Sequence, residues 1–148
     1  MDIIFIALLS IHIIAGTAWV GFAMFFEIVV EQHKRQVLLL HIGPRLGRYL
    51  AIASTMTIIA GALLIVYGYL FYNMSIFGNG ASTLVIGGLL GAIAWLLGIY
   101  LGLLSPRLNG QKAGPVQSQT IGRMRIVGRI ELALLIITII FMVLGSNI

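Results

Sequence analysis

The sequence predicts an all-α membrane protein, a bundle of four transmembrane helices with both termini outside the cell. Of its 148 residues, 60% are apolar and only 9% are charged, which is too little polar surface for a water-soluble domain. All nine Lys and Arg residues fall within two stretches, 34–48 and 107–129. Cytoplasmic connections are enriched in basic residues, so we expect both stretches on the cytoplasmic side of the cell membrane.

Four apolar segments define the expected helices within a single membrane domain, 1–148. Each is long enough, or nearly so, to cross about 30 Å of hydrocarbon. The first segment follows Asp2 rather than a basic residue, and it is longer than the apolar part of a signal peptide, so we expect it to remain as a helix. The fourth run needs the turn before it to reach a full span. The expected helices cover about 3–30, 47–72, 82–104 and 124–146.

The connection between the second and third helices contains no basic residue, so it is expected outside. Aromatic side chains near it are typical of a membrane interface, where they anchor a helix in the headgroup region. These residues are Tyr67, Tyr69, Phe71, Tyr72 and Phe77.

Composition also limits the function. The formal net charge is +5, but the cations flank apolar spans, where they set topology and contact anionic lipid, so nucleic-acid binding is not expected. The chain has no cysteine, which excludes disulfides, thiolate zinc sites and iron–sulfur clusters. A metal or cofactor must therefore be held by His, Met or carboxylate. Expected partners are membrane lipids, together with other membrane subunits or further copies of the chain.

Glycines on the third helix form two small-xxx-small pairs, Gly87 with Gly91 and Gly98 with Gly102. This spacing lets helix backbones approach closely in a membrane. We expect the stripe to serve packing within the bundle rather than to form a substrate groove or a homodimer seam.

On the first helix, His12, Gly16 and Trp19 share one face because they are four and three residues apart. A large flat ligand would use an imidazole to coordinate it, a glycine to admit its edge and an indole to pack on it. Ionisable residues within a span are functional candidates. Alternatively, neutral His12 bonds a neighbouring carbonyl or hydroxyl group and Trp19 belongs to ordinary bundle packing.

Met56 on the second helix is expected at nearly the depth of His12, roughly 13 Å below the outer edge of the hydrocarbon. His and Met are suitable axial ligands for haem iron, and both also suit copper. His12 and Met56 are therefore the candidate metal ligands. Met24 is a third residue for a copper path, but it faces away from the His12 stripe. His33 and His41 fall in the first cytoplasmic connection, and we interpret both as interfacial.

A second polar layer is expected near the cytoplasmic boundary. Its arginines could bind haem propionates or lipid phosphates through paired donors, or they could fix helix register and reach to the interface. A proton relay through its acids is a further alternative. The layer consists of Glu27, Arg45, Arg48, Arg129 and Glu131.

Three motifs resemble a known family over roughly residues 5 to 66: His12-Ile-Ile-Ala-Gly-Thr-Ala-Trp19-Val-Gly21, Gly-Pro-Arg45-Leu-Gly-Arg48 and Thr57-Ile-Ile-Ala-Gly61. They resemble the first half of small CopD-like membrane proteins, including the HemJ-type protoporphyrinogen IX oxidases. The resemblance implies that His12 is a ligand of b-type haem, or of copper in the CopD-like branch. It also implies that Arg45 and Arg48 match the basic start of the second helix. The third helix, 83–104, lacks the lysine and histidine that the oxidases carry there, which argues against that enzymatic activity.

The leading hypothesis is a b-type haem protein of the cell membrane, acting in electron transfer or as a subunit of a membrane oxidoreductase. His12 would ligate iron with Met56 as a second ligand, Gly16 and Trp19 would contact the macrocycle, and Arg45 and Arg48 would hold the propionates. One alternative is a non-catalytic accessory subunit of a respiratory or transport complex. The other alternative is a copper-handling membrane protein.

Overall fold

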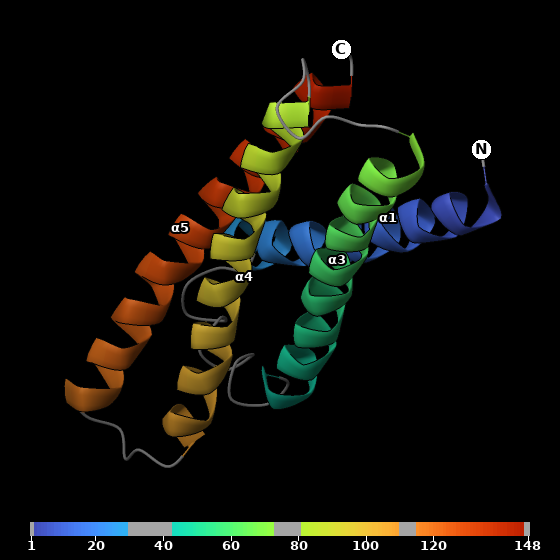
Figure 1. Ribbon diagram of the computed structural model, residues 1–148. Coiled ribbons are helices and arrows are strands. Elements are labelled where there is room, and N and C mark those ends of the chain that lie inside the picture. Colours follow the sequence, from blue (N-terminus) through green and yellow to red (C-terminus); the bar gives the residue numbers. More distant parts are fainter. Residues whose placement is uncertain (1, 30–42, 73–80, 110–114, 147–148) are drawn as a thin grey trace.

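The protein is helical throughout the part of the chain that the computed structural model describes, and no strand occurs there (Figure 1). The described residues are 2–29, 43–72, 81–109 and 115–146. The helices are α1 (Ile3–Met24), the π-helix η1 (Phe25–Val29), α3 (Gly43–Tyr72), α4 (Ala81–Asn109) and α5 (Pro115–Ser146). Four spans in these helices are long and apolar enough to cross a membrane, at Ile3–Ile28, Gly47–Phe71, Ser82–Leu104 and Ser118–Gly145. The predicted four-helix membrane fold is therefore confirmed.

The largest difference from the predicted bounds lies at the start of α5, which begins at Pro115 rather than near 124. Hydropathy marks only the apolar part of a helix, whereas backbone hydrogen bonding continues through polar turns. Proline suits the first helical position, because its missing N–H would have no partner inside the helix there. α5 therefore includes Arg123, which lies before the predicted helix, 124–146.

The helices α4 and α5 form one antiparallel pair, and glycines of α4 lie along the seam between them. A Cβ atom added to any of three glycines would lie within 3.5 Å of an α5 atom. The contacting pairs are Gly87–Phe141, Gly91–Thr138 and Gly98–Glu131. The predicted packing role is confirmed for these three glycines. A Cβ at Gly102 would meet no described atom within 4 Å.

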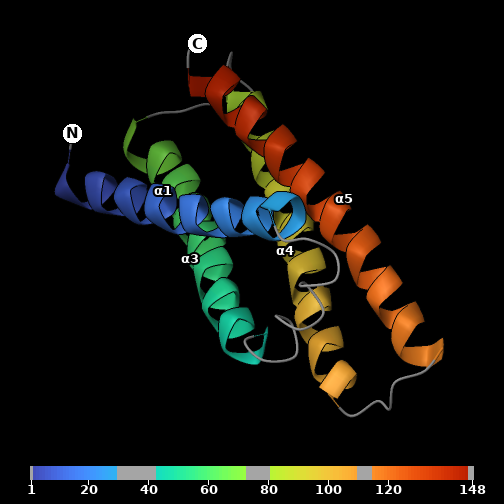
Figure 2. The ribbon, with the colours of Figure 1, turned by 180° about the vertical axis from the view of Figure 1, so that it is seen from behind.

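The helices α1 and α3 form the second pair: their contacts run in opposite order along the two helices, and α1 crosses α3 steeply (Figure 1). Near the start of α1, the Tyr67 hydroxyl donates a hydrogen bond of 3.2 Å to Oδ2 of Asp2, which is the N-cap residue. Further along α1, His12 and Gly16 contact Thr57. Figure 2 shows α1 in front of α3, with its C-terminal end reaching α5.

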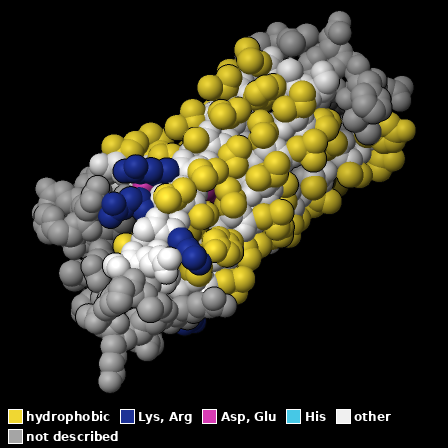
Figure 3. Space-filling view, turned by 90° about the vertical axis from the view of Figure 1, so that its left-hand side faces the viewer, with side chains coloured by type: hydrophobic (Ala, Val, Ile, Leu, Met, Phe, Trp, Pro, Cys, Tyr) yellow, Lys and Arg dark blue, Asp and Glu magenta, His cyan; other side chains and the backbone are white. Residues whose placement is uncertain are grey.

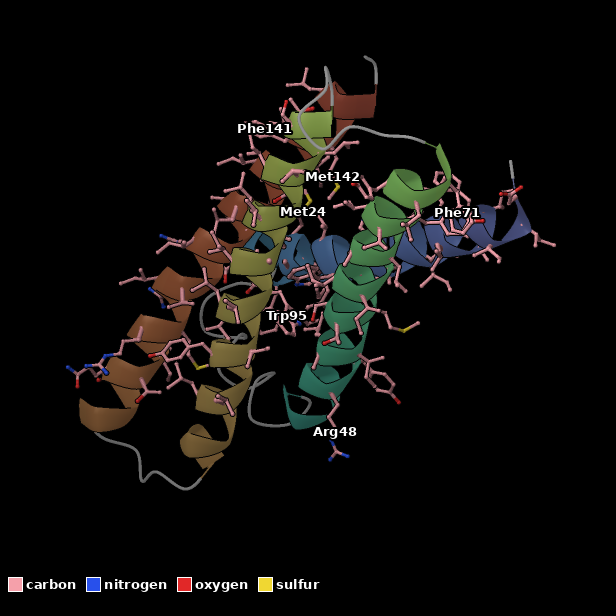
Figure 4. The ribbon with its side chains drawn as sticks, in the orientation of Figure 1. Met24, Arg48, Phe71, Trp95, Phe141 and Met142 are labelled. Carbon is pink, nitrogen blue, oxygen red and sulfur yellow. The ribbon has the colours of Figure 1, made fainter. Side chains whose placement is uncertain are left out.

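The two pairs meet around a small buried core. Trp19 of α1, Ala94 of α4 and Leu135 of α5 are 4%, 0% and 2% exposed. Trp95 projects from α4 toward α3, where its Nε1–H donates a hydrogen bond of 3.1 Å to the Thr55 hydroxyl (Figure 4). All four spans therefore converge at the level of Trp19.

The outer surface has the distribution of side chains that is typical of a membrane protein. Figure 3 shows a long face covered by hydrophobic side chains, with basic side chains gathered at one end beside an acidic one. The described basic side chains are Arg48, near the start of α3, and Arg123, Arg125 and Arg129, in the first half of α5. We call this the basic end. The end of α5 lies at the opposite end, and the start of α1 lies to the side of the upper half of α3 (Figure 1).

Candidate functional site

His12 lies in the middle of α1, on the side that packs against α3. Its Nδ1 is 2.8 Å from the carbonyl oxygen of Thr57, and a Cβ atom added to Gly61 would lie 2.9 Å from its Cε1. Thr57 and Gly61 are one turn apart on α3, so glycine at the second position leaves room for the imidazole ring. A carbonyl oxygen only accepts hydrogen bonds, so Nδ1 carries the proton and Nε2 of the neutral ring keeps its lone pair.

This hydrogen bond is the contact that the packing alternative predicts for His12. It is also the contact that orients a metal-ligating histidine, since such residues usually donate their second ring N–H to a carbonyl or carboxylate. The geometry at Nδ1 is therefore compatible with both roles of His12.

Gly16 and Trp19 share the His12 face of α1, as predicted, and both take part in helix packing. A Cβ atom added to Gly16 would lie 3.4 Å from Cγ2 of Thr57. Trp19 is buried, and its Nε1–H donates a hydrogen bond of 3.0 Å to Oε1 of Glu131. The stripe is thus in contact with two other helices, α3 and α5.

Met56 does not lie on the α1-facing side of α3. Its side chain is 45% exposed, and it is the next residue, Thr57, that receives the His12 imidazole. Met24, the other sulfur-bearing residue considered for copper, is 41% exposed on α1. The structure therefore does not gather the thioethers around His12. In the described helices, no group of three or more His, Asp or Glu side chains could hold a metal ion.

Arg48 is exposed and points away from the bundle in the second turn of α3 (Figure 4). Arg129 is exposed on α5. Arg45 belongs to the first turn of α3, but its side chain lies outside the described part of the chain, as do the whole of His33, His41 and Phe77. Their predicted roles stay predictions.

Glu131 is the residue whose place differs most from the sequence interpretation. It was expected near the cytoplasmic boundary, yet it is only 7% exposed and lies between Trp19 of α1 and Gly98 of α4. A Cβ atom added to Gly98 would lie 2.9 Å from its Oε1. Glu131 is buried because Trp19 of α1 supplies a hydrogen-bond donor and Gly98 of α4 leaves space for its carboxyl group.

A signal for this placement exists in the sequence. The α4 glycines 87, 91 and 98 are separated by four and seven residues, and so are the α5 residues Met142, Thr138 and Glu131 read backward. Matching spacings on two segments indicate an antiparallel seam, with Glu131 opposite Gly98.

Glu27 lies one turn nearer the basic end than Glu131 on the same side of α5. A Cβ atom added to Gly128 would lie 2.7 Å from its Oε1. In an ideal α-helix Glu27 would point about 80° away from Trp19. A π-helix such as η1 has more residues per turn than an α-helix, so each residue rotates less about the helix axis. This smaller rotation brings Glu27 back toward α5. The two acids of the predicted polar layer therefore face one helix seam.

The chain was compared with protein-family models, curated proteins and solved structures, and none of them matches. What defines the protein is thus its own architecture: a four-span membrane bundle with a polar seam between α1 and α5 and a histidine between α1 and α3.

Proposed function

We propose that the protein is a b-type haem protein of the cell membrane and that His12 ligates the iron. The observation that carries this proposal is the 2.8 Å contact between Nδ1 of His12 and the Thr57 carbonyl oxygen. It fixes the tautomer with a bare Nε2 and holds the ring in one orientation, which a ligand imidazole needs. An ionisable residue in the middle of a span also favours a functional role.

The other predicted contacts fit a haem less well than His12 does. Gly16 and Trp19 are already in contact with Thr57 and Glu131, and Met56 is exposed. We therefore assign only the iron ligand, His12, and leave the second ligand to another residue or another chain. Arg48, exposed at the basic end, is available for an anionic group such as a propionate or a lipid phosphate.

Bound haem would supply one-electron chemistry, and its proposed role is electron transfer, alone or as a subunit of a membrane oxidoreductase. The basic connections would lie in the cytoplasm, as the distribution of Lys and Arg favours. Haem is favoured over copper because Met24 and Met56, the thioethers that a copper path would use, are both exposed.

The test is an absorption spectrum of detergent-solubilised protein produced with an adequate haem supply, before and after dithionite. We expect a Soret band and a reduced α band that His12→Ala removes. The chain has three histidines, so His33→Ala and His41→Ala are matched controls and should leave both bands in place. A colourless wild type after haem reconstitution, or an unchanged spectrum in His12→Ala, contradicts the proposal.

A second candidate function is a non-catalytic accessory subunit that packs against a larger complex. It is favoured by one observation: the α1 residues suited to a flat ligand, Gly16 and Trp19, are used in helix packing instead. This function predicts that the colourless chain co-purifies at fixed stoichiometry with larger membrane proteins. Affinity purification of a tagged chain from its native membrane, read out by mass spectrometry and absorption, separates the two functions.

A further inference from the structure

We propose that the carboxyl group of Glu131 is a proton-binding site inside the membrane, and that it exchanges its proton with water at the basic end past Glu27. This proposal is independent of haem, because it concerns the seam between α1, α4 and α5 rather than the His12 contact with α3.

The position of Glu131 is the first step. It lies near the middle of the α5 span, Ser118–Gly145, and its side chain is 7% exposed. Burying an ionised carboxylate without a paired charge is expensive in hydrocarbon, and such residues within spans mark ion and proton pathways. A buried carboxyl group avoids this cost by binding a proton, which makes it neutral, and it becomes charged when it releases that proton.

The surroundings of Glu131 accommodate both protonation states. Its Oε1 accepts the Trp19 Nε1–H, which is a neutral donor and gives up no proton. This bond can form whether the carboxyl is protonated or ionised, and it is stronger for the ionised form. The absence of a side chain at Gly98 leaves space for the same oxygen, since an added Cβ would lie 2.9 Å away. The seam therefore holds the carboxyl in place while its charge changes.

Glu27 provides the connection to water. It contacts Gly128, which precedes Glu131 by three residues, about 4.5 Å along the α5 axis, so the Glu27 carboxyl lies beside the turn of α5 that leads to Glu131. Beyond Glu27 is the basic end, where Figure 3 shows basic side chains beside an acidic one. A proton that enters at this end meets Glu27 before Glu131.

Other charged groups near the seam come from several elements. On α5, Arg129 is exposed, and Arg125 has a buried Nε without a hydrogen-bond partner in the described structure. From η1 comes Glu27 itself. Between 82 and 104 on α4, the ionisable side chain is Tyr100, which is exposed. On α3, Arg48 is exposed at the basic end, and on α1, His12 faces α3. Glu27 is thus the charged group from another element that lies beside Glu131 on this seam.

Tryptophan fluorescence tests this proposal directly. The chain has two tryptophans, so Trp95→Phe leaves Trp19 as the single reporter, hydrogen-bonded to the carboxyl in question. A change of charge on Oε1 alters the field at the indole and shifts its emission. In liposomes, we expect Trp95→Phe to show a reversible pH transition, which Trp95→Phe/Glu131→Gln abolishes.

The matched control is Trp19→Phe, in which Trp95 remains with its Thr55 partner and should give emission independent of pH. In the Trp95→Phe background, Glu27→Gln should move the transition to another pH without removing it. Circular dichroism at each pH checks that the helices persist. A flat profile for Trp95→Phe overturns the proposal, and so does a transition that survives Glu131→Gln.

A second measurement uses the wild-type chain and needs no folded variant. A hydrophobic carbodiimide takes the proton of a protonated carboxyl on its nitrogen, while the carboxyl oxygen bonds to its central carbon. The adduct rearranges to a stable acylurea with no leaving group. We expect peptide mass spectrometry to find this adduct on Glu131, in a yield that falls at alkaline pH. Absence of the adduct at every pH contradicts a protonatable Glu131. A haem spectrum is unaffected by either result, so the two proposals fail separately.

Discussion

The indole Nε1–H of Trp19 donates a hydrogen bond of 3.0 Å to Oε1 of Glu131, which lies 112 residues further along the chain. The bond joins the first span to the last one, and both residues are buried. In lipid, where apolar side chains gain little by associating, such interhelical polar contacts and close packing hold helices together.

The first prediction concerns the strength of this bond. Trp19→Phe removes the donor but keeps an aromatic ring, so we expect the free energy of unfolding to fall by about 1–3 kcal/mol, the usual effect of leaving a buried partner unpaired. Unfolding in mixed detergent and dodecyl sulfate micelles, followed by circular dichroism, measures it.

The control for this bond is Trp95→Phe, whose donor pairs with the neutral Thr55 hydroxyl and should give a smaller loss. A double-mutant cycle with Glu131→Gln should yield a coupling energy of about 0.6–2 kcal/mol. Additive effects of the two substitutions would show that the contact contributes nothing to stability.

The second prediction concerns the seam between α4 and α5. Gly98→Ala would place a Cβ atom 2.9 Å from Oε1 of Glu131, so the helices must separate or the carboxyl must move. We expect a loss of about 1–3 kcal/mol in the free energy of unfolding, typical of overpacking. Gly102→Ala, on the same helix but with no described atom within 4 Å, should be neutral or stabilising, since alanine favours a helix by up to about 1 kcal/mol over glycine. Equal effects at the two positions would contradict the described seam.

The third prediction concerns the seam between α1 and α3. Gly61→Ala would bring a Cβ atom within 2.9 Å of Cε1 of His12 and displace the imidazole from the Thr57 carbonyl. If His12 ligates iron, as proposed, the Soret band should shift or weaken, whereas Gly21→Ala, which has open space, should leave it unchanged. A normal spectrum in a well-folded Gly61→Ala protein would count against this orientation of His12.

The fourth prediction concerns Met56. Because its side chain is 45% exposed on α3, we expect Met56→Leu to leave both the thermal stability and any haem spectrum at wild-type values. Differential scanning fluorimetry and reduced spectra measure the two quantities. Loss of the α band in Met56→Leu, but not in Met24→Leu, would instead identify Met56 as the second iron ligand.

The fifth prediction concerns orientation. The chain lacks cysteine, so a single introduced cysteine is the one thiol that a maleimide can label. Ile3→Cys, at an 83% exposed position, should react with a membrane-impermeant maleimide in intact cells. Gln119→Cys, exposed near the start of α5, should react only after permeabilisation. The opposite pattern would place the basic end outside.

The sequence was sufficient to predict the four spans, because apolar length is what a bilayer selects. It also predicted the face shared by His12, Gly16 and Trp19, since helical periodicity fixes it. It did not place the start of α5, because a helix continues through polar turns that hydropathy cannot mark.

The contents of the candidate site were harder to predict. Depth counting placed Met56 opposite His12, but depth says nothing about which side of α3 a residue occupies, and Met56 turned out to be exposed. Glu131 was assigned to the boundary layer because acids are most easily tolerated there. Its burial depends on the Trp19 donor and on the space at Gly98, two partners from distant segments whose approach follows from tertiary packing.

The pairing of α1 with α3 and of α4 with α5 has a consequence for biogenesis. Each pair is a helical hairpin whose main contacts are internal, so the first hairpin can associate in the bilayer while the ribosome is still producing the second. The Trp19 indole remains without its carboxyl partner until the final span is inserted. Formation of that bond therefore distinguishes a completed chain from one truncated before the last span.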